Sequence, residues 1–110
     1  MTTKEVEVKL KEYIILHIEI NNLKIDLEGY EEYGQTGLYN KAKIRLADLE
    51  AKIKVLDDAL STLRPEDCEL IRLRYFRRYD ISYIADKLNI ANSNVQKRKK
   101  RILEQLVEIF

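Results

Sequence analysis

The chain of 110 residues has few of the residues that interrupt or cross-link a fold: one proline, one cysteine, three glycines and no tryptophan. So few prolines and glycines exclude a sandwich or barrel with many tight turns. The single cysteine, Cys68, has no partner for an internal disulfide, which fits a reducing cytoplasm. No apolar run reaches the roughly 18 residues that a membrane span requires, and we expect no signal peptide.

The sequence also has little of the chemistry that an enzyme needs. It contains no cluster of metal ligands, no paired nucleophile and base, and no nucleotide-binding motif. The only histidine, His17, lies inside an apolar stripe, where a packed side chain is the simpler interpretation than a ligand or a base. We therefore predict no catalytic residue, no metal site, no cofactor and no enzymatic activity.

The net charge of +1 hides an uneven distribution of charge. Residues 64–101 contain 11 Lys and Arg against 5 Asp and Glu, a net charge of +6, whereas residues 1–63 have a net charge of −3. Because an acidic segment is repelled by nucleic acid, we expect the first segment to point away from any nucleic acid that the basic one binds.

Two long segments before residue 64 have the apolar periodicity of helices. Apolar residues recur every three or four positions in residues 3–28, and the Glu- and Lys-rich flanks favour a helix over a strand. Residues 38–63 continue the spacing of a coiled-coil seam with Ala42, Leu46, Leu49, Ile53, Leu56, Leu60 and Leu63. All three glycines fall in residues 29–37, which predicts a mobile connector. The two helices form either an antiparallel hairpin or a seam shared between two chains.

Residues 80–106 have the apolar spacing of a helix-turn-helix, and a helix that begins at Pro65 precedes them as support. Asp80 is placed to cap the first helix, whose inner face is formed by Ile81, Ile84, Ala85 and Leu88. Asn89 suits a turn with positive φ. The second helix, about residues 92–106, has an inner stripe of Val95, Ile102, Leu103 and Leu106. We predict that this second helix enters the major groove of DNA.

Polar and basic side chains lie opposite that inner stripe. The first turn holds short polar side chains that can approach base edges, and amide side chains can pair with adenine. Five consecutive cations, Lys97 to Arg101, then suit phosphates. A basic run alone is usually only a solvated helix face, but its position within this helix favours DNA. Arg77 and Arg78 are further phosphate candidates, although arginine stems often only cover apolar surface.

The segment Leu63–Leu106 resembles the fourth conserved region of sigma-70-type RNA polymerase sigma factors, which reads the promoter −35 element. The likeness is strongest in L-R-Y-F (73–76), I-A-D-K-L-N-I (84–90) and V-Q-K-R-K-K-R-I-L (95–103). It is closer still to the sigma-like domain of small phage and prophage transcription regulators of the ArpU and RinA type. Those regulators often place a helical segment ahead of such a domain.

The resemblance implies roles for single residues. It implies base contacts by Asn92, Ser93, Gln96 and Lys97, and phosphate contacts by Arg98, Lys100 and Arg101, to which we add Asn94, Arg77 and Arg78. Two departures affect this assignment. Arg78 and Asp80 stand where the family usually has Gly and Ser. Ala91 stands where the family usually has a Ser or Thr cap, so we expect Asn92 to cap the recognition helix instead.

We therefore predict an all-α chain with a coiled-coil-like hairpin in residues 1–63, for oligomerisation or partner binding, and a sigma-70 region 4-like DNA-binding domain in residues 64–110. The expected function is a sequence-specific transcriptional regulator of phage or prophage late-gene type in the cytoplasm of a bacterial host. Its expected partners are double-stranded DNA, a second copy bound through the N-terminal helices, and RNA polymerase. Two alternatives stay open: a small-terminase-like DNA-packaging protein, and a sigma-mimicking protein-interaction module that does not bind DNA.

Overall fold

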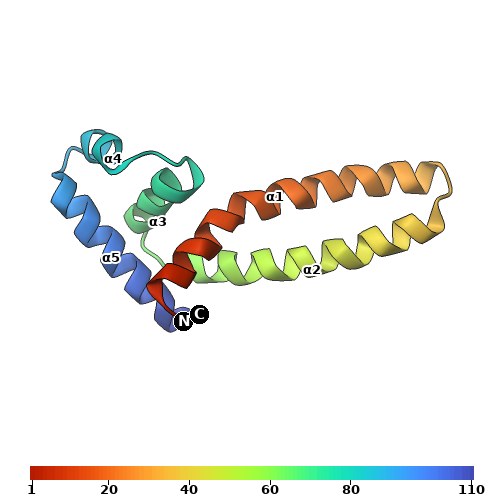
Figure 1. The fold of residues 1–110 in the computed structure, drawn as a ribbon, viewed down its shortest axis with the longest axis horizontal. Coiled ribbons are helices and arrows are strands. Elements are labelled where there is room, and N and C mark those ends of the chain that lie inside the picture. Colours follow the sequence, from red (N-terminus) through yellow and green to blue (C-terminus); the bar gives the residue numbers. More distant parts are fainter.

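A computed structural model describes all of residues 1–110, and its regular elements are helices only. Two long helices, α1 (Thr3–Glu32) and α2 (Thr36–Leu60), run antiparallel as a hairpin. Three shorter helices, α3 (Pro65–Ile71), α4 (Ile81–Leu88) and α5 (Asn92–Ile109), gather at one end of it (Figure 1). The molecule measures 57 × 28 × 21 Å. The predicted all-α architecture is confirmed, and the hairpin forms within one chain.

The predicted connector over residues 29–37 is wrong in length. Only Tyr33, Gly34 and Gln35 separate the two long helices, while Gly29 lies inside α1 and Gly37 inside α2. Gly34 has φ +66, a conformation that glycine adopts without the steric penalty of a Cβ atom. Tyr30, next to Gly29, and Tyr39, two residues after Gly37, are half-buried near the tip of the hairpin.

Apolar side chains fill the interior of the hairpin. Ile20 of α1 and Leu49 and Ile53 of α2 form a buried cluster, with partly buried side chains around it: Tyr13, Leu16, Leu23 and Leu46. The Tyr13 hydroxyl donates a hydrogen bond to the Asp57 carboxylate, which joins the two helices nearer their other end. Exposed ion pairs between the helices add little to stability, because water and salt screen them.

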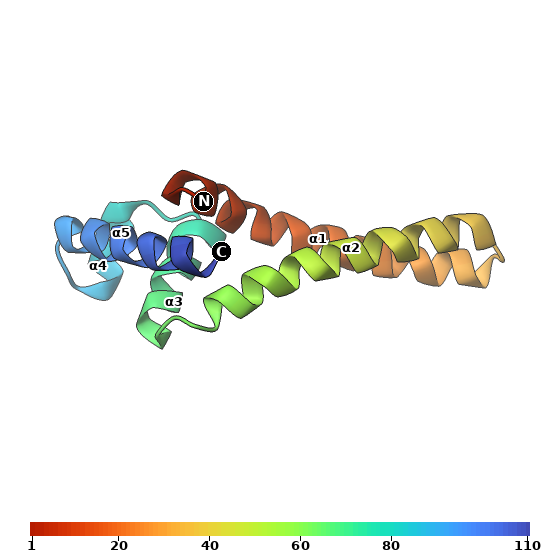
Figure 2. The ribbon, with the colours of Figure 1, turned by 90° about the horizontal axis from the view of Figure 1, so that it is seen from below.

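The larger core joins the hairpin to the C-terminal helices. Val6 and Leu10, in the first turns of α1, are fully buried in the cluster that also contains Ala59, Leu63 and the inner faces of α3, α4 and α5. Both views show α1 beginning beside the end of α5 (Figure 1, Figure 2). The core therefore crosses residue 63, where we expected one unit to end, and the two-unit division stays a prediction.

The supporting helix after Pro65 differs from a single regular helix. It begins as α3 and then widens into a π-helical turn, Arg72–Phe76, in which the Arg77 amide bonds to the Arg72 carbonyl at 2.9 Å. Tyr75 of this turn is buried, and its hydroxyl donates to Glu7 of α1 at 2.7 Å. The Phe76 ring stacks on Tyr13, with centroids 4.7 Å apart. The wider turn thus directs two aromatic side chains against α1.

Candidate nucleic-acid interface

Local hydrogen bonds fix the turn between α4 and α5. Asp80 caps α4 as predicted, because its carboxylate accepts a hydrogen bond of 2.8 Å from the Tyr83 amide. Asn89 adopts the left-handed conformation, with φ +57, as its position suggested. The Ile90 amide then bonds to the Ala85 carbonyl at 3.0 Å, and the Ile90 side chain packs against the core. The chain therefore enters α5 at a defined angle.

The inner stripe of α5 holds this helix against α3 and α4. Val95, Ile102 and Leu106 are fully buried, and Leu103 is nearly so. A helix turns by about 100° per residue, so Ser93, Lys97, Lys100 and Glu104 lie on the opposite side. All four side chains are exposed. The outward side of α5 is thus polar and then cationic over its first three turns, and Glu104 ends the cationic part.

The four expected base-reading residues, Asn92, Ser93, Gln96 and Lys97, are all exposed at the start of α5. Asn92 does not cap the helix, contrary to expectation. Ala91 is the N-cap residue, and it makes no side-chain hydrogen bond there. The Asn92 amide group donates instead to the Ser82 hydroxyl of α4 at 3.2 Å. Asn92 therefore joins the two helices of the motif, because α4 lies within reach of its side chain.

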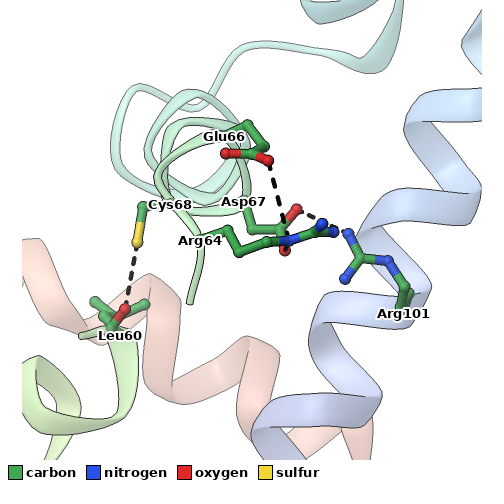
Figure 3. A network of polar contacts seen from close by, with 6 residues as sticks. All are labelled: Leu60, Arg64, Glu66, Asp67, Cys68 and Arg101. Carbon is green, nitrogen blue, oxygen red and sulfur yellow. Dashed lines mark hydrogen bonds and ion pairs between the residues drawn. The ribbon is translucent and has the colours of Figure 1, made fainter. Parts of the chain in front are cut away.

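The expected phosphate-binding residues of α5 fall into two groups. Asn94, Arg98 and Lys100 are exposed, and their side chains form no hydrogen bond or ion pair within the chain. Arg101 is different, because its guanidinium donates a hydrogen bond of 2.8 Å to the Asp67 carboxylate of α3 (Figure 3). The hydrogen bond to this carboxylate raises the pKa of Arg101 above its ordinary value. Arg101 thus fastens the recognition helix to α3.

Asp67 is the one buried charged residue of the chain, with 2% of its surface exposed. Arg64 approaches its second carboxylate oxygen at 3.6 Å, so two arginines compensate the buried charge (Figure 3). A buried carboxylate is stable only when such partners satisfy it. In the sequence, Asp67 is one of two acidic residues in the first turn of the helix that begins at Pro65, where a carboxylate is favoured by the positive end of the helix dipole. Nothing in the local pattern indicated a partner 34 residues away.

Arg77 and Arg78 are exposed in the segment between the π-helical turn and α4, and neither is paired with a carboxylate. Arg78 has φ +59, in the left-handed region. A positive φ is expected at this position, because the family that this segment resembles usually has glycine there. Arg74, three positions before Arg77, instead donates a hydrogen bond to the Tyr79 carbonyl at 3.2 Å and so stabilises the fold of this segment.

Tyr79, just before α4, and Tyr83, in its first turn, pack against one another. The rings of Tyr79 and Tyr83 have centroids 4.3 Å apart, and Tyr83 remains exposed in the first turn of α4. Ser82, which accepts the hydrogen bond from Asn92, lies beside them and is also exposed. The sequence did not single out Ser82. The available signal in the sequence was its place in the first turn of the first helix of the predicted helix-turn-helix.

Other kinds of site are not seen in the structure. No group of three or more His, Cys, Asp or Glu side chains is arranged to hold a metal ion. None of the helices combines the length and the apolar character required to cross a membrane. The cysteine thiol donates to the Leu60 carbonyl at 3.2 Å, and burial raises its pKa (Figure 3).

Comparison with known proteins identifies the segment that contains this interface. Residues 59–108 match the family model described as Sigma-70, region 4. The match begins in the last turn of α2 and extends through α3, the π-helical turn, α4 and nearly all of α5. No curated protein and no solved structure matches the chain. The matched family is a helix-turn-helix DNA-binding region and is not a family of enzymes.

Proposed function

We propose a function from the premise that residues 59–108 are a sigma-70 region 4 domain, and hence a DNA-binding helix-turn-helix. The chain is a sequence-specific regulator of transcription that places α5 in the major groove of double-stranded DNA. The single observation that supports this best is the burial of Val95, which turns Ser93, Lys97 and Lys100 outward. A major groove admits one such helix, and its base edges are distinguishable there.

The side chains divide by length and by position along α5. Asn92, Ser93, Gln96 and Lys97, in its first turns, read base edges. Phosphates flank the groove and are bound by the surrounding set: Asn94, Arg98, Lys100, Arg101, Arg77 and Arg78. Among the cations of α5, Lys100 and Arg98 contribute more than Arg101, because they are free of internal ion pairs while Arg101 is engaged with Asp67.

The finer role follows from the resemblance to phage and prophage regulators of the ArpU and RinA type, in which a helical segment precedes such a domain. The chain acts in the cytoplasm of a bacterial host, on late genes, and forms a homodimer through its N-terminal helices. A dimer requires two half-sites separated by one helical turn of DNA, about 34–36 Å, or by a multiple of it. The hairpin, which extends away from α5, is free to contact RNA polymerase.

Gel shifts at several salt concentrations test the placement of α5. For the double variant Arg98→Ala, Lys100→Ala, binding should weaken on every sequence, and the slope of log K against log salt should flatten by roughly 1.8. A matched control is Lys41→Ala, Lys43→Ala, which removes two exposed lysines of α2 from the far end of the hairpin. Equal slopes for the two double variants would place the duplex elsewhere.

Selection of bound sequences from random duplexes tests base reading. The wild-type protein should return one preferred sequence, and Gln96→Ala should change the preference more than the affinity. An unchanged preference would remove Gln96 from the reading set. Complete lack of binding at low salt would favour the sigma-mimicking protein module. Assembly into a ring would favour the small-terminase-like packaging protein.

A further inference from the structure

Four large apolar side chains of α1 remain in contact with solvent. Val8, Ile15, Ile18 and Ile25 are 52, 47, 55 and 66% exposed. They lie on the side of α1 that faces away from α2, since Ile20, which is buried against α2, is about 200° around the helix from Ile18. Single exposed apolar residues are ordinary on protein surfaces. These four, however, lie along one side of one helix.

Their spacing is that of a second coiled-coil seam on α1. Val8 and Ile15 are seven residues apart, Ile18 and Ile25 are again seven apart, and Ile15 and Ile18 are three apart. Two exposed polar residues, Lys11 and Asn22, occupy the remaining seam positions. We call these six residues the outer stripe: Val8, Lys11, Ile15, Ile18, Asn22 and Ile25.

The outer stripe reads the same in both directions: apolar, polar, apolar, apolar, polar, apolar. An interface with two-fold symmetry joins the same surface of two copies, so its residues must be complementary when one copy is reversed. In an antiparallel pair of α1 helices, Val8 faces Ile25 of the second copy and Ile15 faces Ile18. The remaining seam pair is then Lys11 with Asn22. Each apolar side chain meets an apolar one, and each polar side chain meets a polar one.

A parallel pair lacks this complementarity, because Lys11 would face Lys11 of the second copy inside the seam. Like charges at such positions are destabilising. In the antiparallel pair, Lys11 instead lies beside the turn that contains Asn22 and Asp26 of the second copy. Asp26 is exposed and forms no ion pair within its own chain. Glu19, the nearest other carboxylate of the stripe's border, is already paired with Arg45 at 3.3 Å.

The other side of the hairpin shows no such order. Ile44 and Val55 of α2 are exposed, at 74 and 55%, but the side chains between them on that side include the small Ala51 and the charged Asp48. Three residues, one of them an alanine, offer less apolar surface than the outer stripe of α1. They therefore serve as a control surface.

We propose that a second copy of this chain packs on the outer stripe of α1, with the two α1 helices antiparallel, and that this contact makes the protein a homodimer. The contact depends on the hairpin alone and does not require DNA. The inference rests on the homodimer of the proposed function and names the surface that forms it. A dimer without DNA binding, or DNA binding by a monomer, separates it from the proposed contact between α5 and DNA.

Sedimentation equilibrium of the full chain tests the contact. We expect a dimer for the wild-type protein. Ile18→Asp should weaken the dimer by roughly 100-fold or more, because each dimer would bury two carboxylates without partners. Ile44→Asp makes the same change on the other side of the hairpin and should leave the dimer intact. Both positions are exposed in the single chain, so circular dichroism should show unchanged helix content. A wild-type monomer at millimolar concentration, a ring, or dissociation by Ile44→Asp alone would overturn the proposal.

Disulfide trapping tests the antiparallel register in a Cys68→Ser background, which keeps a donor for the Leu60 carbonyl. A disulfide requires Cα atoms about 4.4–6.8 Å apart. Lys11→Cys and Asn22→Cys proteins should each remain uncross-linked alone, and an equal mixture of the two should form a covalent dimer. Cross-linking of Asn22→Cys with itself would show a parallel pair and refute the register.

Discussion

The ion pair between Arg101 and Asp67 gives the most direct test of how the recognition helix is held. Arg101→Ala removes the guanidinium that lies 2.8 Å from the Asp67 carboxylate. Asp67 has only 2% of its surface exposed, so water cannot replace the lost partner. The variant should therefore be less stable than the wild type, although Arg101 itself is an exposed residue of α5.

The size of the effect follows from burial and from the remaining partner. Removing one member of a buried ion pair costs about 3–5 kcal/mol in the free energy of unfolding. The cost is smaller here because the Arg101 side chain is 45% exposed and Arg64 stays 3.6 Å from the carboxylate. We expect a loss of about 2 kcal/mol, which lowers the melting temperature by roughly 8 °C.

Urea unfolding of four proteins measures this loss: wild type, Arg101→Ala, Asp67→Asn and the double variant. The double variant should lose less than the sum of the single losses, by about 1 kcal/mol or more, because the two side chains share one interaction. Lys100→Ala is the matched control, since Lys100 is the exposed neighbour without a partner, and its change should stay within about 0.5 kcal/mol. A loss below that limit for Arg101→Ala, or strictly additive losses, would refute the reasoning.

The same variant distinguishes two roles for Arg101 in DNA binding. If Arg101 only fastens α5 to α3, the folded variant should keep the wild-type salt slope. If it contacts a phosphate as well, the slope should flatten by roughly 0.9. The measurement is a gel-shift series at a temperature where the variant is fully folded, with Lys100→Ala as the variant that should flatten the slope.

Two further predictions concern the backbone before α4 and the hairpin. Arg78→Gly should raise the free energy of unfolding by up to about 1 kcal/mol, because φ +59 costs arginine more than glycine. Arg77 has φ −88, so Arg77→Gly should instead lower the free energy of unfolding. Urea unfolding of both variants without DNA makes the comparison. Burial, together with its hydrogen bond to Asp57, raises the pKa of Tyr13 from 10.0 to about 12, so folding favours the neutral phenol. The stabilisation from this group is complete below pH 10 and is lost between pH 10 and 12. Between pH 8 and pH 11, the free energy of unfolding should fall more for the wild type than for Tyr13→Phe. Equal falls for the two proteins would contradict this cause.

Much of the fold could be predicted from local patterns. The cap by Asp80, the positive φ of Asn89 and the burial of Val95 all follow from residues within a few positions of one another, and the structure confirms them. The connector was predicted too long, because glycine lowers helix propensity by only about 1 kcal/mol and packing between two helices offsets that. The π-helical turn had no recognisable signal in its sequence, since it serves contacts with α1.

The candidate site was predictable as a helix surface but less so as a set of side chains. Helical periodicity places Ser93, Gln96 and Lys97 outside without any knowledge of the neighbours, and their roles toward DNA remain proposals. Arg101 was grouped with the other cations because a helical wheel records direction alone. A long side chain at the border of the wheel binds whatever lies within its reach, and here that is the Asp67 carboxylate.

By itself the sequence determined the helices, the apolar side of each, and the helix-turn-helix with its basic second helix, because periodicity, caps and turn residues act between near neighbours. Only the tertiary structure decided that Val6 and Leu10 complete the core of the C-terminal helices, that Asp67 is buried, and that Arg101 turns toward it. Those outcomes depend on which helices lie side by side. Segments far apart in the chain come together through the packing of whole apolar faces, and single residues do not encode that packing.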